Sequence, residues 1–167
     1  YGGRFGDTIR AGDVRAQAEP LGLEAGQKSE MRVRVAGRVT LLRVMGKLAF
    51  ATIRDESGPI QIGMSKGDLA EHWDLVKQLD LGDIVGGAGV VGKTKTGELT
   101  VWADSVTLLS KSMRPPPEKW HGLTDVDLRY RRRYVDVFAN PEVREVFRQR
   151  SAIIEAVRGR LLGLGYN

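Results

Sequence analysis

The chain contains no cysteine, and this absence excludes disulfides, thiolate metal sites and cysteine nucleophiles. Its two histidines, His72 and His121, lie far apart and have no metal-ligand spacing, so we expect no metal site. No apolar run approaches the ~20 residues that a membrane-spanning helix needs. No basic and then apolar leader opens the chain, so no secretory signal is expected. The composition favours a cytoplasmic protein that is not embedded in a membrane.

Positive charge is in excess, but only in the last third of the chain. The 167 residues hold 26 Lys and Arg against 21 Asp and Glu, a net charge of +5. Residues 1–110 hold 14 basic and 14 acidic side chains, so the whole excess lies in residues 111–167. This charge is compatible with a nucleic-acid partner. Because residues 1–110 are neutral overall, we expect them to bind a nucleic acid through a few placed contacts.

Alternating apolar and polar residues predict strands from Met31 onward. The first strand is expected to bend near Gly37 and the Leu41–Leu42 pair, where the alternation breaks. The stretch "GKLAFATIRDESGPIQIGM" (residues 46–64) predicts a hairpin of strands two and three. A helix at Asp68–Leu79 follows, and then strands at about 83–91 and 98–109, joined by a loop at residues 92–97. This order predicts a mainly β fold, the five-stranded OB barrel with its helix between strands three and four.

The remaining segments divide the chain further. Residues 1–30 form an N-terminal extension with a short helix around Ala11–Ala18, which is expected to begin near Asp7 or Thr8. Residues 31–110 form the barrel, and the proline-rich residues 111–122 form a stiff linker. In residues 123–167, helices are predicted at about 125–137 and from Asn140 and Pro141 to the glycines at 163 and 165.

The last predicted helix carries an apolar stripe that needs a partner surface. The rest of the chain offers none, so we expect the chain to be part of a larger protein. The stripe contains Val143, Val146, Phe147, Ile153, Ile154, Val157 and Leu161.

One face of the predicted hairpin carries an aromatic residue among polar ones. Phe50 shares this face with Thr52, Arg54, Gln61 and Gly63. In OB barrels the face of strands two and three binds single-stranded nucleic acid. Phe50 offers a plane on which a base can stack, and Gln61 offers a donor and an acceptor to a base edge. Further candidate contacts to phosphates or bases are Arg43, Lys47, Arg54, Lys93 and Lys95.

Other interpretations of these features stand beside this one. An isolated exposed aromatic also occurs without a function, and the basic run Arg129–Tyr134 fits either a phosphate clamp or a solvated face. Trp73 is expected in the core, whereas Trp102 and Trp120 fit either a core or a site. Residues 87–94 have P-loop spacing, but they lie in a strand pattern without the helix that a phosphate cradle needs.

The segment "RPPPEKWHGLTDVDLRYRRRYVDVFANPEVREVF" (residues 114–147) resembles bacterial lysyl-tRNA synthetases, class II enzymes of the subgroup shared with the aspartyl and asparaginyl enzymes. The stretches "YGGRF", "VAGRV", "RVMGKLAFATIRDESGPIQI", "LDLGDIVGGAG" and "KTKTGELTV" resemble the lead-in and the anticodon-binding OB domain of the same family. The chain departs from the family pattern at the second of three prolines, which is usually leucine, and at "VFAN", where leucine–isoleucine is commoner.

The resemblance implies that the barrel recognises the anticodon loop of tRNA(Lys). Phe50 matches the aromatic that stacks on the central anticodon base, and Gln61 matches the glutamine that reads this base, a uridine. Arg43 matches an arginine that helps to hold the base, and Glu98 matches a glutamate near the third base.

The resemblance also implies what the chain lacks. Residues 123–167 match the start of the class II catalytic domain, and the motifs for ATP and lysine are absent. We therefore expect no catalytic residue here, and ATP-dependent and Mg²⁺-dependent ligation of lysine to tRNA only in the parent protein. The family's dimer contact corresponds to residues 141–165, so a homodimer is expected through this helix.

Two other functions are open on the sequence alone. One is a general single-strand-binding OB module, although the neutral charge of residues 1–110, which include the barrel, argues against it because such modules use an electropositive groove. The other is the OB domain of a lysyl-tRNA synthetase paralogue joined to a different activity.

Overall fold

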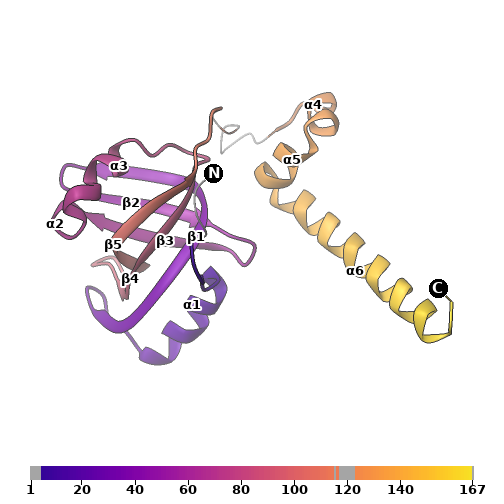
Figure 1. Ribbon diagram of the computed structural model, residues 1–167, viewed down its shortest axis with the longest axis horizontal. Helices are drawn as coiled ribbons and strands as arrows, with labels where there is room; N and C mark the ends of the chain where they lie inside the picture. Colours follow the sequence, from indigo (N-terminus) through magenta and orange to yellow (C-terminus); the bar gives the residue numbers. More distant parts are fainter. Residues whose placement is uncertain (1–4, 115, 117–122, 167) are drawn as a thin grey trace. The chain divides into compact units, whose positions relative to one another are not determined.

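The computed structural model describes residues 5–114, 116 and 123–166 (Figure 1). The chain divides into two compact units, Tyr1–Pro115 and Pro116–Asn167, which we call the barrel unit and the helical unit. Most of the predicted linker, including Trp120 and His121, lies outside the described residues.

Five strands close into a barrel in the order β1-β2-β3-β5-β4 (Figure 1). Neighbouring strands are antiparallel except β3 and β5, which pair in parallel. The predicted OB barrel is thus confirmed. The strands are β1 (Lys28–Met45), β2 (Leu48–Arg54), β3 (Pro59–Ser65), β4 (Ile84–Lys93) and β5 (Leu99–Ser110).

Strand β1 pairs with β4 along its first part and with β2 along its second part, and it bends between the two. Arg38 pairs with both Ile84 of β4 and Arg54 of β2, and the register with β2 shifts between Val39 and Leu41. The shift lies where the alternation breaks in the sequence. Gly37 permits the close approach, since a Cβ there would lie 2.8 Å from the carbonyl oxygen of Arg54. A one-residue irregularity of this kind curls a strand around a small barrel.

The hairpin of β2 and β3 fills the core as its alternation predicts. In β2 every second side chain is buried and the others are half-buried. The inward apolar residues of both strands pack in one cluster with those of β1, β4 and β5. The hairpin contributes Ala49, Ala51, Ile53, Ile60, Ile62 and Met64 to that cluster.

The segment between β3 and β4 is not the single helix predicted at Asp68–Leu79. It consists of α2 (Lys66–Leu69), the 3-10 turn η2 (Ala70–His72) and α3 (Trp73–Lys77). The break lies at Ala70, whose φ of 27° is incompatible with a continuing right-handed helix. The apolar residues Leu69, Trp73, Val76 and Leu79 are nevertheless all in the barrel core. Their spacing therefore predicted the core contacts, and the burial of Trp73 is confirmed, but it did not predict the break.

Helix α1 spans Ala11–Ala18, as predicted, and is followed by the 3-10 turn η1 (Glu19–Leu21), but the residue expected at its start is different. Neither Asp7 nor Thr8 is the N-cap; that position is Arg10, which makes no side-chain cap. Instead, the Ala11 N–H donates to Asp55 Oδ2 at 2.7 Å and the Gly12 N–H donates to Ser57 Oγ at 2.8 Å. The turn between β2 and β3 thus supplies the cap.

The helical unit contains α4 (Val126–Arg131), α5 (Arg133–Ala139) and α6 (Pro141–Gly163). The single helix predicted at about 125–137 is interrupted at Arg132, which leaves helical geometry at φ −117° and ψ 53°. Arg129 and Arg133 on either side of this break both bind the buried carboxylate of Asp136. Helix α6 begins at Pro141 and ends at Gly163, as predicted.

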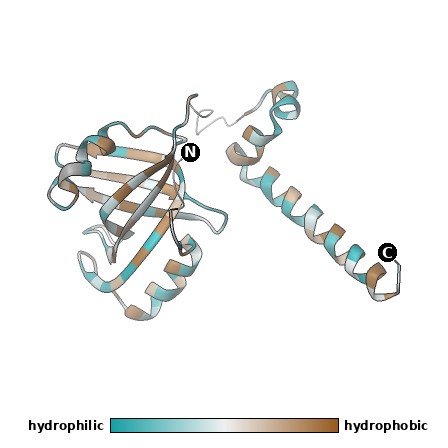
Figure 2. Ribbon diagram, in the orientation of Figure 1, coloured by the Kyte–Doolittle hydropathy of each residue, from teal (hydrophilic) through white to brown (hydrophobic). Residues whose placement is uncertain are grey.

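Apolar side chains recur along α6 and stay exposed (Figure 2). They include Val146, Phe147, Ile153, Ile154, Val157 and Leu161, whereas Val143 is buried. No helix in the described part of the chain is long and apolar enough to cross a membrane.

Candidate nucleic-acid interface

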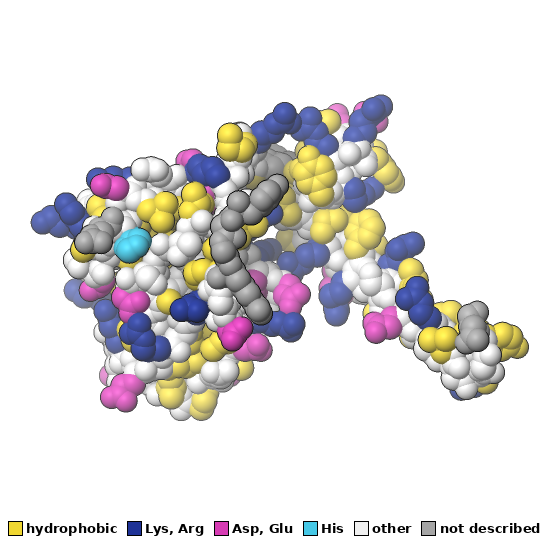
Figure 3. Space-filling view, viewed as in Figure 1, with side chains coloured by type: hydrophobic (Ala, Val, Ile, Leu, Met, Phe, Trp, Pro, Cys, Tyr) yellow, Lys and Arg dark blue, Asp and Glu magenta, His cyan; other side chains and the backbone are white. Residues whose placement is uncertain are grey.

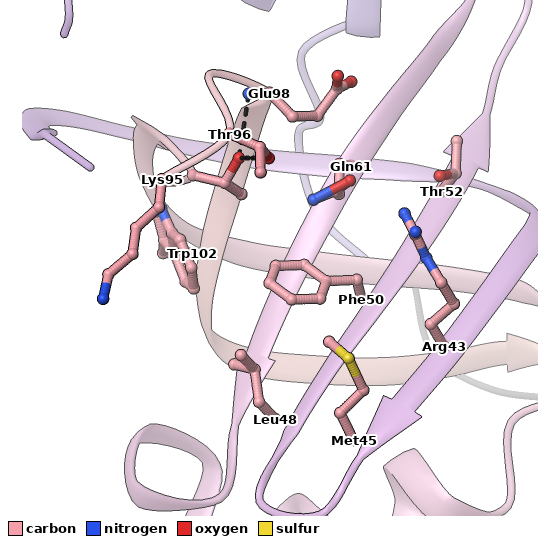
Figure 4. Close-up of a pocket in the computed structure, with 11 residues that line it drawn as sticks. Arg43, Met45, Leu48, Phe50, Thr52, Gln61, Lys95, Thr96, Glu98 and Trp102 are labelled. Atoms are coloured by element: carbon pink, nitrogen blue, oxygen red, sulfur yellow. Dashed lines mark hydrogen bonds between the residues drawn. The ribbon is translucent and has the colours of Figure 1, made fainter. Parts of the chain in front are cut away.

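A hollow of about 610 Å³ opens on the outer face of the barrel, beside the loop between β4 and β5 (Figure 4). Its lining comes from β1, β2, β3, β5 and this loop. The lining residues are Arg43, Met45, Leu48, Phe50, Thr52, Gln61, Thr94, Lys95, Thr96, Glu98 and Trp102.

Strand register assembles the floor of this hollow. Arg43 of β1 pairs with Phe50 of β2, and Phe50 pairs with Gly63 of β3. The parallel pairing then sets Gly63 beside Trp102 of β5. Residues in register on neighbouring strands point to the same face of a sheet, so this row is continuous across four strands.

Trp102, which the sequence left open between core and site, stands beside Phe50. The two ring centroids are 5.9 Å apart and the rings meet at 71°, so Phe50 forms a floor and Trp102 a wall (Figure 4). Room for the indole comes from glycine: a Cβ on Gly63 would lie 2.8 Å from its Cε3 atom, and one on Gly92 would lie 3.1 Å from its Cδ1 atom. The ammonium of Lys28 lies 4.9 Å from the indole centroid, within cation–π range.

Gln61 lines the hollow on the face that its parity predicts, but it is buried there and not exposed to solvent. Its side chain and backbone together are only 7% exposed. Its Nε2 atom donates to Thr100 Oγ1 at 3.2 Å, because β5 lies alongside β3 and covers that edge of the hairpin. Phe50 is likewise half-buried rather than isolated in solvent. Both residues therefore have defined surroundings, which is what a recognition site needs.

Charged groups stand at the rim of the hollow. Arg43 is exposed and extends its guanidinium toward Thr52 and Gln61 (Figure 4). Lys95 and Glu98 are exposed on the loop between β4 and β5.

This loop is a closed turn. The Thr94 N–H donates to the Glu98 carbonyl at 2.9 Å, and the Glu98 N–H donates to Thr94 Oγ1 at 3.0 Å. Gly97, at φ 84°, takes the left-handed position that such a turn requires. The turn places Lys95 and Glu98 at the mouth of the hollow.

Three predicted cationic contacts do not line the hollow. Lys47 lies in the turn between β1 and β2 and is exposed. Arg54 is at the far end of β2, opposite Arg38 and Pro59. The ammonium of Lys93 donates to the carbonyl of Leu23 at 2.8 Å. Of the predicted contact residues, the structure brings together Arg43, Phe50, Gln61, Lys95 and Glu98.

Basic and acidic side chains are intermingled over the face of the barrel that Figure 3 shows, without a continuous basic strip. In the basic run of the helical unit, Arg129 and Arg133 form ion pairs with Asp136. Arg131 forms an ion pair with Asp127. Within the described residues, no group of three or more His, Cys, Asp or Glu side chains can hold a metal ion.

Comparison with known proteins agrees with this fold. Residues 33–109 match the family model of the OB-fold nucleic acid binding domain. The chain is 48% identical to the lysine–tRNA ligase of Carboxydothermus hydrogenoformans over 159 residues, which is 95% of this chain and 31% of that protein. It is 50% identical to the lysine–tRNA ligase of Pelotomaculum thermopropionicum, over 99% of this chain and 32% of that protein.

A third relative, the lysine–tRNA ligase of Xanthomonas campestris pv. campestris, is 48% identical over 96% of this chain and 32% of its own length. The chain thus spans about a third of the length of the curated relatives that it matches. The barrel, the family model and these relatives agree on one conclusion: the chain holds an OB fold and is similar to a part of lysine–tRNA ligases.

Proposed function

We propose that the barrel recognises the anticodon loop of tRNA(Lys) as the specificity-determining part of a lysine–tRNA ligase. The observation that carries this proposal is the convergence of Phe50, Gln61 and Arg43 in one hollow. The Phe50 ring is the surface on which the central base stacks, since aromatic platforms of OB barrels bind unpaired bases in this way. Arg43, at the edge of that platform, holds the base or its phosphate.

Gln61 is proposed to identify the central base as uracil. The edge of uracil carries an N3–H donor between two carbonyl acceptors, whereas cytosine has an acceptor at N3 and a donor at its amino group. The Gln61 Oε1 atom accepts from uracil N3–H, and the Nε2 hydrogen that Thr100 does not bind donates to a uracil carbonyl.

The rim supplies contacts to the neighbouring nucleotides. In this proposal Glu98 contacts the third anticodon base and Lys95 contacts a phosphate, and the support is that both side chains line the hollow. Lys47, Arg54 and Lys93 lie outside the hollow, so any phosphate that they contact belongs to a more distant part of the tRNA.

The rest of the reaction is proposed for a longer protein. It ligates lysine to tRNA with ATP and Mg²⁺ in the cytoplasm, and we assign no residue of this chain to that chemistry. In this proposal residues 1–30 are the N-terminal extension, 31–110 the anticodon-binding domain, 111–122 the linker and 123–167 the start of the catalytic domain.

Titration of anticodon stem-loops that differ only in the central base tests the proposal. We expect the loop with a central U to bind about 1–3 kcal/mol more tightly than the same loop with C or A in the same buffer. Equal binding of all three contradicts anticodon recognition and points to a general single-strand-binding module.

We also propose that two chains pair through residues 141–165. The observation behind this is the exposed apolar stripe of α6, of which Ile153, Ile154, Val157 and Leu161 line a shallow hollow of about 380 Å³ together with Tyr166. An uncovered stripe of this length favours self-association, because burial of apolar surface is the main gain in protein–protein contacts.

Sedimentation tests this pairing. The full chain is expected to dimerise, and residues 1–122 alone are expected to be monomeric. Ile154→Glu places a charge in the stripe and is expected to weaken the dimer, whereas Ala152→Glu adds the same charge half a turn away and is the matched control. Dimerisation of residues 1–122 contradicts the proposal.

A further inference from the structure

Behind Gln61, two hydrogen bonds lead in sequence to the backbone of the loop between β4 and β5. Gln61 Nε2 donates to Thr100 Oγ1 at 3.2 Å, and Thr100 Oγ1 donates to the Glu98 carbonyl at 3.0 Å. Thr100 is completely buried, with an exposed fraction of 0%. It does not line the hollow, so it would not contact a bound base itself.

The direction of this relay is set by the number of protons available. A threonine hydroxyl has one proton to donate, and Thr100 gives it to the Glu98 carbonyl. Its oxygen can then only accept, so the Gln61 side chain must present its NH₂ group to Thr100 and its carbonyl oxygen elsewhere. Rotating the amide by half a turn would set two acceptor oxygens against each other.

The far end of the relay is anchored in turn. The Glu98 carbonyl also accepts the N–H of Thr94, which closes the loop between β4 and β5. Thr100 cannot redirect its proton to a reversed Gln61 amide without abandoning that carbonyl. The rim loop and the amide thus share one hydrogen-bonded network.

From this geometry we propose that Thr100 is a positioning residue that holds the Gln61 amide in the orientation that selects uracil over cytosine. The inference rests on the proposed role of Gln61 in reading the central base. A held amide presents its oxygen to a donor at N3, which uracil has and cytosine lacks. A freely rotating amide can present its NH₂ to N3 of cytosine and its oxygen to the cytosine amino group.

The test compares the U-to-C binding ratio of the wild-type chain with that of Thr100→Val, which keeps the shape of the side chain and removes the hydroxyl. We expect the ratio to fall by about 3- to 10-fold, the equivalent of one hydrogen bond. Thr100→Ser keeps the hydroxyl and is expected to retain the wild-type ratio.

Thr40→Val is the matched control. The Thr40 hydroxyl also donates to a carbonyl on a neighbouring strand, that of Thr52 at 3.1 Å, but Thr40 does not line the hollow. Its substitution is expected to leave the ratio unchanged.

The outcomes separate this inference from the proposed function. If wild-type protein prefers U and Thr100→Val keeps the full preference, or loses affinity equally for both loops, the positioning role is overturned. If wild-type protein itself binds U and C equally, it is the proposed function that fails.

A second measurement needs no variant. In the wild-type chain, the side-chain NH₂ of Gln61 is expected to show one proton protected from exchange with water, and free exchange of both protons overturns the inference.

Discussion

The barrel unit buries its apolar side chains, whereas the helical unit leaves most of its own exposed. Among the described residues, every buried apolar side chain except that of Val143 lies in the barrel unit. A closed sheet has an inside and no free edge, so alternation along each strand is enough to make a core. Three consecutive helices have no facing layer unless another surface covers them. The same kind of amphipathic pattern therefore predicts a core in one unit and a docking surface in the other.

The two units are more alike in their buried charges. Asp83 in the barrel unit and Asp136 in the helical unit are both 0% exposed. Asp83 accepts hydrogen bonds from the Lys111 ammonium and the Ser112 N–H, and Asp136 accepts from Arg129, Arg133 and Asn140. Burial alone raises the pKa of each carboxyl group, but these hydrogen bonds outweigh it and hold both pKa values below the ordinary one. The buried carboxylates of both units thus have hydrogen-bond partners, and in this respect the two units are alike.

The largest expected difference comes from the same substitution made in each unit. Ile62, at 1% exposed, fills the barrel core, whereas Ile153 is 63% exposed on α6. Ile62→Ala is expected to lower the free energy of unfolding by about 2–5 kcal/mol because it leaves a cavity. Ile153→Ala is expected to change it by no more than ~0.5 kcal/mol in the monomer. Denaturant unfolding followed by tryptophan fluorescence and by circular dichroism measures both changes. Equal losses of unfolding free energy would contradict this difference between the two units.

Loss of an aromatic ring is expected to affect tRNA binding only in the barrel unit. Phe50→Ala should weaken stem-loop binding by about 1–3 kcal/mol, the usual contribution of one stacked base. Phe147→Ala, the same change on α6, is the control and should leave that affinity unchanged. Isothermal titration of both variants with the loop that has a central U gives the comparison. A large loss of stability with unchanged binding in Phe50→Ala would mean that the ring is structural.

Helix caps should contribute less, and each to its own unit. Asp55 caps α1 from 44 residues away, whereas Asp125 caps α4 by accepting the Leu128 N–H three residues ahead. Asp55→Ala is expected to destabilise the barrel unit by about 0.5–2 kcal/mol, and Asp125→Ala to affect only the helical unit by a similar amount. Glu56→Ala is the control, because it removes from the same turn an exposed carboxylate that pairs with the Arg10 side chain, whereas Asp55 accepts a backbone N–H of α1. If Asp55→Ala behaves like that control, the long-range cap does not contribute to stability.

The smallest expected effect is on how the stability of each unit depends on acidic pH. The lowered pKa values of Asp83 and Asp136 mean that their stabilisation is fully present above the ordinary value of 3.8. It is lost as the pH falls from there through the lower pKa of the folded state. Asp83→Asn should reduce the loss of stability at acidic pH in the barrel unit only. Asp136→Asn should reduce it in the helical unit only. Thermal melts between neutral pH and pH 2 measure this. If both variants lose stability in acid as steeply as the wild-type chain, other carboxylates cause the loss.

The sequence predicted the parts of the site that depend on near neighbours. The turn between β2 and β3 sets the register of the hairpin, so Phe50, Gln61 and Gly63 share a face as their parity predicts. It did not predict the wall that Trp102 makes, because that wall depends on the parallel pairing of β5 with β3. The one local signal was glycine at positions 63 and 92, which leaves space that a large ring can fill.

The order of strands and helices along the chain, the bend in β1, the extent of α1 and α6, and the core residues of the β2–β3 hairpin could all be predicted from the sequence. Each follows from periodicity and turn residues within a short window, where side-chain direction alternates in a known way. Tertiary contacts set the cap of α1 by Asp55 and Ser57, the break at Ala70 and the orientation of Gln61 against Thr100. The two caps and the Gln61 contact join residues about forty positions apart, and the Ala70 break lies where the helical segment packs its apolar side chains into the core. Such features exist only once the barrel has closed, because closure is what brings β5 against β3 and the hairpin turn against α1.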